Sequence, residues 1–281
     1  MKKHTWLVLM VALAAVLCIP YGAGAEKNGK LYVVGMGPAG PDLTAPRALE
    51  IVKKADYYFC SPRMPLRFEA FKDYIDPTKV VYFEDEGEAK RKGGKIDSQS
   101  RKAARKQKRK KTQAFIMEKI KAGKTVVMMD GGDACVYGPT LNGLLLGLDE
   151  KYYEVVPGLG AFNAAAAAMK RSMTCDESRF VMLTSPRSLL GKNMAPEDGI
   201  LKDLAKYKTT MVLYMSLGKL KDMTAELKKY FPPDYPVSVI YYAGYVDRET
   251  VLKTSLGKIE EDVQKMDEKW LGLVVMGECA N

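Results

Sequence analysis

The sequence predicts an α/β protein of two domains, with a parallel sheet in the N-terminal domain and a mixed sheet in the C-terminal one. Short apolar segments of strand length alternate with amphipathic segments of helical spacing along most of the chain. Such alternation is typical of parallel sheets covered by helices. The chain has 281 residues, of which 47% are hydrophobic, and this suffices for two modest cores.

The N-terminal domain is expected to span residues 26–172. A helix over residues 44–55 begins at Thr44 as N-cap, with Pro46 in its first turn. A long helix over residues 98–122 is basic first and apolar later, and Gly123 ends it. An alanine-rich helix over residues 161–169 is expected to close this domain. The predicted strands of the domain cover residues 31–34, 57–59, 80–83, 125–129 and 153–156.

The C-terminal domain is expected to span residues 173–281. Its predicted helices cover residues 201–206 and 220–229. Residues 250–256 can add an extra strand, and this makes the sheet mixed rather than purely parallel. The other predicted strands cover residues 180–183, 210–215, 237–241 and 271–276.

Residues 1–25 have the pattern of a secretory signal peptide. A basic start at residues 2–4 precedes an apolar run over residues 7–17, which is too short to span a bilayer comfortably. Small residues ending at Ala25 offer a cleavage site before Glu26. We therefore expect an exported, periplasmic protein, or a membrane-anchored one if the segment stays uncleaved.

The cysteines and the histidine limit the chemistry of the mature chain. One disulfide is possible in an oxidising compartment, although the sequence does not select the pair. The single histidine of the chain is His4, which lies in the signal segment. A histidine-based metal site or catalytic triad is therefore excluded, and no metal is expected. The cysteines outside the signal segment are Cys60, Cys135, Cys175 and Cys279.

A G-x-G-x-x-G pattern follows the first strand, at Gly35, Gly37 and Gly40. In a dinucleotide site this pattern forms a tight phosphate loop that leads directly into a helix. Here Pro38 lies inside the loop and Pro41 follows it, so the loop is longer and stiffer than a phosphate cradle requires. The dinucleotide interpretation is therefore disfavoured.

Two further glycine loops follow predicted strands of the same domain. Residues 130–138 read Asp-Gly-Gly-Asp-Ala-Cys-Val-Tyr-Gly, and residues 157–160 read Pro-Gly-Leu-Gly. Glycines at the carboxyl end of a strand let a ligand approach the backbone. Three strands of one sheet thus end in glycine loops at the edge where α/β sheets bind ligands.

These ordered motifs resemble the tetrapyrrole methylases, which transfer a methyl group from S-adenosylmethionine. The opening glycine–proline loop of that family is similar to residues 35–44, with Ala39 in place of a glycine. Its G-D-P-x-x-Y-G motif is similar to residues 132–138, with Ala134 in place of proline. Further matches cover residues 156–158, 213–215, 236–243 and 273–277. The local sequence around Asp247 is similar to that of precorrin-4 methyltransferases. The resemblance extends over residues 30–277.

The resemblance implies two α/β domains with a cleft that holds S-adenosylmethionine, and also a homodimer. It implies that residues 131–133 present backbone to the methionine end, while Met215 and Ala243 enclose the adenine. The residues implied to bind the cofactor are Pro38, Gly131, Gly132, Asp133, Val136, Tyr137, Gly160, Ala161, Met215 and Ala243.

The sequence also departs from the family where some of its members carry functional side chains. Residues 60–63, Cys-Ser-Pro-Arg, replace a motif with an acid after the second strand, and Glu84 and Asp85 stand near an expected lysine. No catalytic residue is therefore assigned.

The positive charge of the chain is concentrated between Lys90 and Lys111. This segment has twelve Lys or Arg and one acid, Asp97, and so carries +11. The whole chain carries +10, or +8 without Lys2 and Lys3, so the rest of the mature chain carries −3. The segment is either a solvated, partly helical arm or a surface for an anionic partner. It has no interleaved aromatic residues for stacking on bases.

Three functions agree with these observations. The first is a methyltransferase that acts on a carbon of a carboxylated, precorrin-like tetrapyrrole. The second is an exported, non-catalytic protein of the same fold that binds a tetrapyrrole or another small ligand. The third is an RNA methyltransferase, although a signal peptide argues against a nucleic acid partner.

Overall fold

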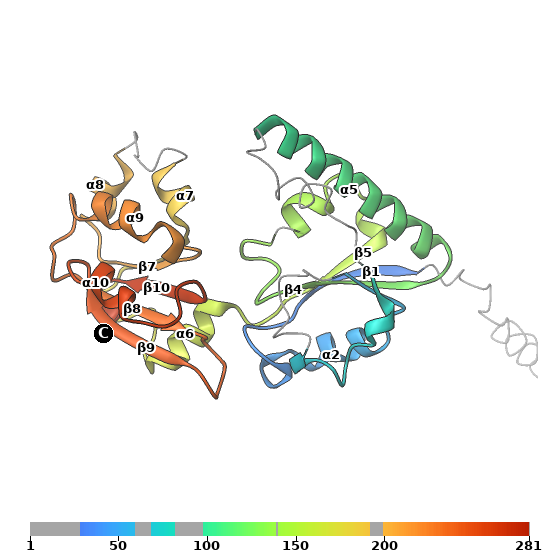
Figure 1. Cartoon of the computed structure of the whole chain (residues 1–281), viewed down its shortest axis with the longest axis horizontal. Coiled ribbons are helices and arrows are strands. Elements are labelled where there is room, and N and C mark those ends of the chain that lie inside the picture. Colours follow the sequence, from blue (N-terminus) through green and yellow to red (C-terminus); the bar gives the residue numbers. More distant parts are fainter. Residues whose placement is uncertain (1–28, 60–68, 82–97, 139, 192–198, 281) are drawn as a thin grey trace, which may run out of the picture.

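The computed structural model describes residues 29–59, 69–81, 98–138, 140–191 and 199–280. The chain forms two α/β lobes joined by a short segment (Figure 1). The predicted signal peptide, Cys60, Glu84, Asp85 and the first part of the basic segment lie outside the described residues.

The sheet of the N-terminal lobe is parallel, as predicted. Its strand order is β3-β2-β4-β1-β5, and every neighbouring pair is parallel. Strands β1 and β4 occupy the centre and pair over their whole length. Because both faces of such a sheet are covered, these strands are nearly continuous apolar runs. The strands are β1 (Lys30–Gly35), β2 (Tyr57–Phe59), β3 (Val80–Val81), β4 (Thr125–Asp130) and β5 (Tyr153–Val156).

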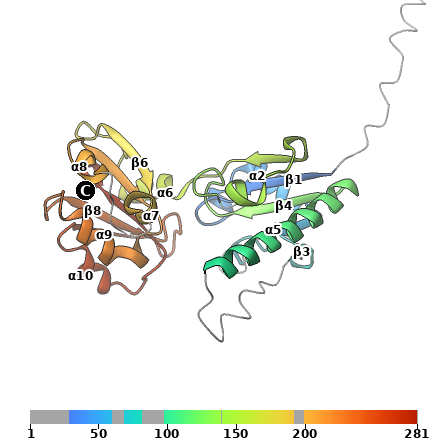
Figure 2. The same cartoon turned by 90° about the horizontal axis from the view of Figure 1, so that it is seen from above.

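Helices cover both faces of this sheet (Figure 2). Helix α2 (Pro46–Lys53) buries Ala48 and Val52 against one face. Helix α5 (Ser98–Lys121) buries Ile116 and Ile120 against the other. The N-terminal half of α5 extends past the sheet toward the C-terminal lobe, and both views agree on this (Figures 1 and 2).

The sheet of the C-terminal lobe is mixed, as predicted. Its order is β6-β7-β10-β8-β9, in which β6 and β7 are parallel and the other neighbours are antiparallel. The extra strand that the sequence proposed over residues 250–256 is β9. The strands are β6 (Phe180–Thr184), β7 (Thr209–Leu213), β8 (Pro236–Tyr241), β9 (Thr250–Ser255) and β10 (Gly272–Met276).

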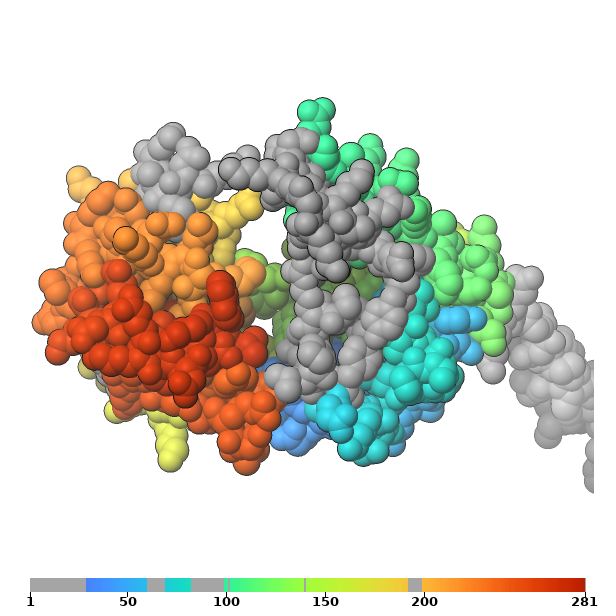
Figure 3. Space-filling model, viewed as in Figure 1, coloured from blue at the N-terminus to red at the C-terminus, as the bar shows by residue number. Residues whose placement is uncertain are grey.

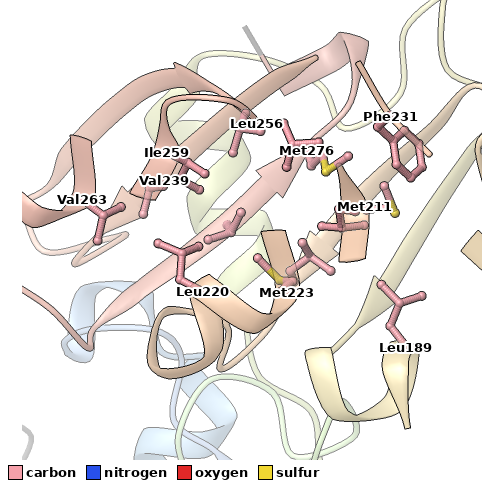
Figure 4. Packing of buried hydrophobic residues seen from close by; sticks show 14 of the residues in the cluster. Leu189, Met211, Leu220, Met223, Phe231, Val239, Leu256, Ile259, Val263 and Met276 are labelled. Atoms are coloured by element: carbon pink, nitrogen blue, oxygen red, sulfur yellow. The ribbon is translucent and has the colours of Figure 1, made fainter. Parts of the chain in front are cut away.

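Helices cover both faces of the second sheet. On one face, Leu220 and Met223 of α9 and Ile259 of α10 pack with Val239 and Met276 (Figure 4). The helices on this side are α7 (Pro186–Leu190), α8 (Ile200–Leu204), α9 (Leu220–Leu227) and α10 (Ile259–Gln264).

The alanine-rich helix α6 (Ala161–Met169) packs on the other face of the second sheet. Its Ala165 and Met169 are buried with Ile240 and Val275. The sequence placed this helix at the end of the first domain, near Ser172, because it follows the last parallel strand directly. Its small side chains instead allow close packing on the second sheet, so the chain passes between the lobes at residues 157–160.

A disulfide joins Cys175 to Cys279, with Cα atoms 5.9 Å apart. It ties the segment after α6 to the last turn of the chain, 104 residues later. Cys135 is an exposed free thiol.

Among the described residues, no helix is both long and apolar enough to cross a membrane.

Candidate functional site

The loops after β1, β4 and β5 lie together at one edge of the first sheet. These three strands are neighbours and run in parallel, so their carboxyl ends share an edge. Gly37 and Gly132 form an isolated antiparallel bridge between the first two loops. The Gly37 amide donates to the Gly132 carbonyl at 3.0 Å, and the Gly132 amide donates to the Gly37 carbonyl at 2.7 Å. Both glycines have positive φ angles, 74° and 72°, which favour glycine.

The loop backbones touch so closely that a side chain has no space between them. A Cβ on Gly158 would lie 2.4 Å from the carbonyl oxygen of Gly132 and 2.6 Å from the carbonyl carbon of Gly35. The loops are therefore joined backbone to backbone at this edge, with Gly35, Gly37 and Gly132 buried.

Replacing Gly158 with alanine is expected to destabilise the protein by about 1–3 kcal/mol, because the clash involves backbone rather than a movable side chain. Chemical denaturation measures this loss. Gly143→Ala is the matched control, since no atom lies within 4 Å of a Cβ there. Equal stability of the two variants would contradict the close packing of these loops.

Asp133 links two of the loops through its side chain. Its Oδ1 accepts hydrogen bonds from the Cys135 amide at 3.1 Å and the Gly158 amide at 3.4 Å. The same motif leaves Gly131 exposed and Val136 half-buried. The acid of the motif thus holds the loops in place while its neighbours face the site.

Thr44 closes the first loop instead of capping the helix that follows. Its hydroxyl donates to the carbonyls of Met36 at 2.8 Å and Gly40 at 3.0 Å. The N-cap of α2 is Ala45, and Pro46 is its first residue. The predicted N-cap was wrong, because the Thr44 hydroxyl bonds carbonyls of the loop and no side chain caps α2.

The C-terminal lobe presents its predicted residues at one edge as well. Strands β7 and β8 are both antiparallel to β10, so their carboxyl ends lie on the same side. Met215 follows β7 and is 68% exposed, and Ala243 follows β8. Ala243 packs against the same apolar cluster as Ala161, at the start of α6.

The two lobes meet at two pairs of loops. The rings of Tyr137 and Tyr214 lie 5.1 Å apart, which joins the loop after β4 to the end of β7. A Cβ on Gly244 would lie 3.2 Å from Pro38 Cγ and 2.7 Å from Leu43 Cδ1, so the loop after β8 meets the loop after β1. An opening separates the lobes in the space-filling view (Figure 3).

Strained backbone gathers in these loops. Among the described residues, four that are not glycine have positive φ, and three of them follow β4, β7 and β8. They are Tyr137 at 55°, Met215 at 55° and Tyr242 at 49°. Such strain costs about 1–3 kcal/mol per residue and is concentrated at functional sites. The sequence alone gives no sign of it, because these residue types rarely adopt this conformation.

Two buried polar groups in these loops lack full hydrogen bonding. Two buried oxygen atoms there have no hydrogen-bond partner: the hydroxyl of Tyr214 and Oδ2 of Asp130. Burial raises the pKa of Tyr214 to about 12, although the nearby Phe162 backbone opposes the change. Burial also raises the pKa of Asp130, against the hydrogen bond of 2.8 Å that Thr140 donates to its Oδ1. Neither Asp130 nor Tyr214 is among the cofactor-binding residues that the family resemblance implies.

Asp130→Asn is expected to remove a pH dependence of stability. Because the pKa of Asp130 is above its ordinary 3.8 in the folded state, the folded protein loses stability as pH rises from about 4 through the folded pKa. The variant should gain up to about 1–3 kcal/mol over the wild type toward neutral pH. Thermal melting across this pH range measures the difference, and parallel curves would contradict it.

The geometry thus defines a class of protein: two α/β domains with glycine loops and strand ends that face each other across an opening. The family model for the Tetrapyrrole (Corrin/Porphyrin) Methylases matches residues 30–260. The chain belongs to this family.

Individual relatives agree with this membership. The cobalt-precorrin-4 C(11)-methyltransferase of Methanocaldococcus jannaschii is 26% identical over 262 residues, which cover 91% of this chain and 90% of the relative. The uroporphyrinogen-III C-methyltransferase of the same organism is 27% identical over 258 residues, covering 90% and 98%. The X-ray structure of a cobalt precorrin-4 methyltransferase superposes with a TM-score of 0.71 at 25% identity, covering 90% of this chain and 96% of that one.

Proposed function

We propose that this protein is an S-adenosylmethionine-dependent methyltransferase that methylates a carbon of a carboxylated, precorrin-like tetrapyrrole. The observation that carries the proposal is the meeting of the glycine loops of the first lobe with the ends of β7 and β8. The named relatives methylate precorrin-4 and uroporphyrinogen-III, and a related uroporphyrin-III C-methyltransferase has been solved with S-adenosylhomocysteine.

The residues present fit such a cofactor. The bridge between Gly37 and Gly132 fixes the two glycine loops against each other, and the neighbouring Gly131 is exposed beside it. The ring of Tyr214 lies 5.1 Å from that of Tyr137, so the two aromatic rings join the loops of both lobes beside these glycines. Met215 and Ala243 offer apolar surface for the adenine.

S-adenosylmethionine supplies an already activated methyl group when it is bound, so the protein needs little acid–base equipment. The loops of both lobes orient the two reactants and exclude water, which can contribute up to ~7–11 kcal/mol to catalysis. Burial raises the pKa of Asp130 above its ordinary value, which favours the protonated form of this carboxyl.

Calorimetry with S-adenosylhomocysteine on the purified protein tests the proposal. We expect binding in the range of about 1 μM to 1 mM, which is typical of enzyme substrates. No heat of binding at millimolar ligand rejects it. Transfer of a labelled methyl group to a reduced, carboxylated tetrapyrrole then separates a methyltransferase from a non-catalytic binding protein.

We also propose that the protein is exported and loses its first 25 residues. The signal-like segment supports export, and so does the pairing of Cys175 with Cys279, because disulfides persist in oxidising compartments. Cell fractionation and the mass of the intact mature chain test this. A cytoplasmic chain that begins at Met1 rejects it.

A homodimer is proposed on the family resemblance alone. Edge strand β6 exposes 53% of Phe180, which packs against Tyr207, and it is a suitable surface to examine first. Light scattering on the purified protein measures the mass, and a monomer at micromolar concentration rejects the dimer.

A further inference from the structure

Helix α5 carries an unusual concentration of positive charge. Between Ser98 and Met117 it has eight Lys or Arg and no acid. Lys102, Arg105, Lys106 and Lys110 are exposed and make no ion pair within the described part of the chain. These cations are therefore available to an anionic partner.

One face of α5 changes along its length from apolar to cationic. The buried residues Thr112, Ile116 and Ile120 form a stripe at helical spacing, with exposures of 7%, 0% and 1%. The same spacing of three or four residues continues to Arg109 and Arg105. On a regular helix the two arginines therefore lie on the same face as these buried residues, with Arg109 half-buried and Arg105 exposed.

The hydrogen bonds of α5 place this arginine end beside the site. Arg109 Nη1 donates to the carbonyl of Gly143 at 3.4 Å, in the helical turn η3 (Thr140–Leu144). The first residue of that turn, Thr140, donates to Asp130 at the end of β4. The N-terminal end of α5 is also its end nearer to the C-terminal lobe (Figures 1 and 2).

We propose that Arg105 and Arg109 form a binding subsite for the carboxylates of the tetrapyrrole substrate at the rim of the opening between the lobes. This inference rests on the proposed function. A guanidinium binds a carboxylate through two parallel hydrogen bonds and remains charged at all relevant pH values. Lys110 lies on the outer side of the helix, where a flat lipid surface or a nucleic acid would make contact instead.

Charge reversal on the two sides of the helix tests the subsite. Arg105→Glu is compared with Lys110→Glu, which makes a comparable charge change about 140° away around the helix axis. The probe is a porphyrin with free carboxylates, and its fluorescence reports binding. We expect Arg105→Glu to weaken binding about tenfold or more, Arg105→Lys to weaken it less, and Lys110→Glu to leave it within about twofold of the wild type.

Two further measurements separate the causes. Circular dichroism checks that the helix is intact, and S-adenosylhomocysteine affinity should be equal in all variants. A fully esterified porphyrin should bind the wild type and Arg105→Glu alike. Equal effects of Arg105→Glu and Lys110→Glu on the free porphyrin would overturn the subsite. If the wild type binds no S-adenosylhomocysteine, the proposed function fails; if it does and only the Arg105 effect is missing, this inference alone fails.

Discussion

Replacing Met215 with lysine is expected to weaken S-adenosylhomocysteine binding by about 100-fold or more. The side chain is 68% exposed without a ligand, so the substitution leaves the fold intact. A ligand that covers this position would bury an ammonium group, which costs several kcal/mol when no counter-charge is present. Calorimetry measures the affinity directly.

Val246→Lys provides the control for this experiment. Val246 is 94% exposed in the loop that follows β8, so the same charge is added to the same lobe on a side chain that is almost fully solvated. We expect its affinity to equal that of the wild type. Unchanged binding in Met215→Lys would remove Met215 from the cofactor site without affecting the family assignment.

Removing the disulfide is expected to lower the free energy of unfolding by about 3–5 kcal/mol. Cross-linking positions that lie 104 residues apart restricts the unfolded chain strongly, and chain-entropy estimates for a loop of this length reach about 4.7 kcal/mol. The double variant Cys175→Ser with Cys279→Ser should melt well below the wild type, as measured by denaturant titration.

Two controls identify the disulfide as the cause. Cys135→Ser should be as stable as the wild type, since this thiol is exposed and unpaired. A reductant should lower the stability of the wild type to that of the double variant and leave the double variant unchanged. A wild type that is insensitive to reductant would contradict the pairing.

Local sequence patterns predicted both sheets, because each strand is a short apolar run between breakers. They also located the glycine loops, since Gly35, Gly132 and Gly158 lie directly after or near strand ends. The family resemblance implied Met215 and Ala243, and the structure places them after β7 and β8 at one edge of the second sheet. These features depend on residues close to one another in the sequence.

The remaining features depend on contacts between distant segments. The placement of α6 depends on which of the two sheets its small residues fit. The hydrophobic periodicity of the helix shows that it has a buried face, but not which sheet covers that face. The sequence allows Thr44 either to cap the helix or to bond the preceding loop, and its hydroxyl bonds the loop carbonyls. The unpaired atoms of Asp130 and Tyr214 become apparent only when the two lobes are assembled around them.

The position of α6 also determines how the lobes can move. Because α6 belongs by packing to the second sheet, residues 157–160 are the one covalent connection between the lobes, and they also line the site. Any change in the angle between the lobes must be absorbed at these residues. Gly158 packs against the backbone of Gly35 and Gly132 so closely that no side chain fits there, and Leu159 and Gly160 lead from it into α6. A ligand held by these residues would therefore also restrict the joint between the lobes.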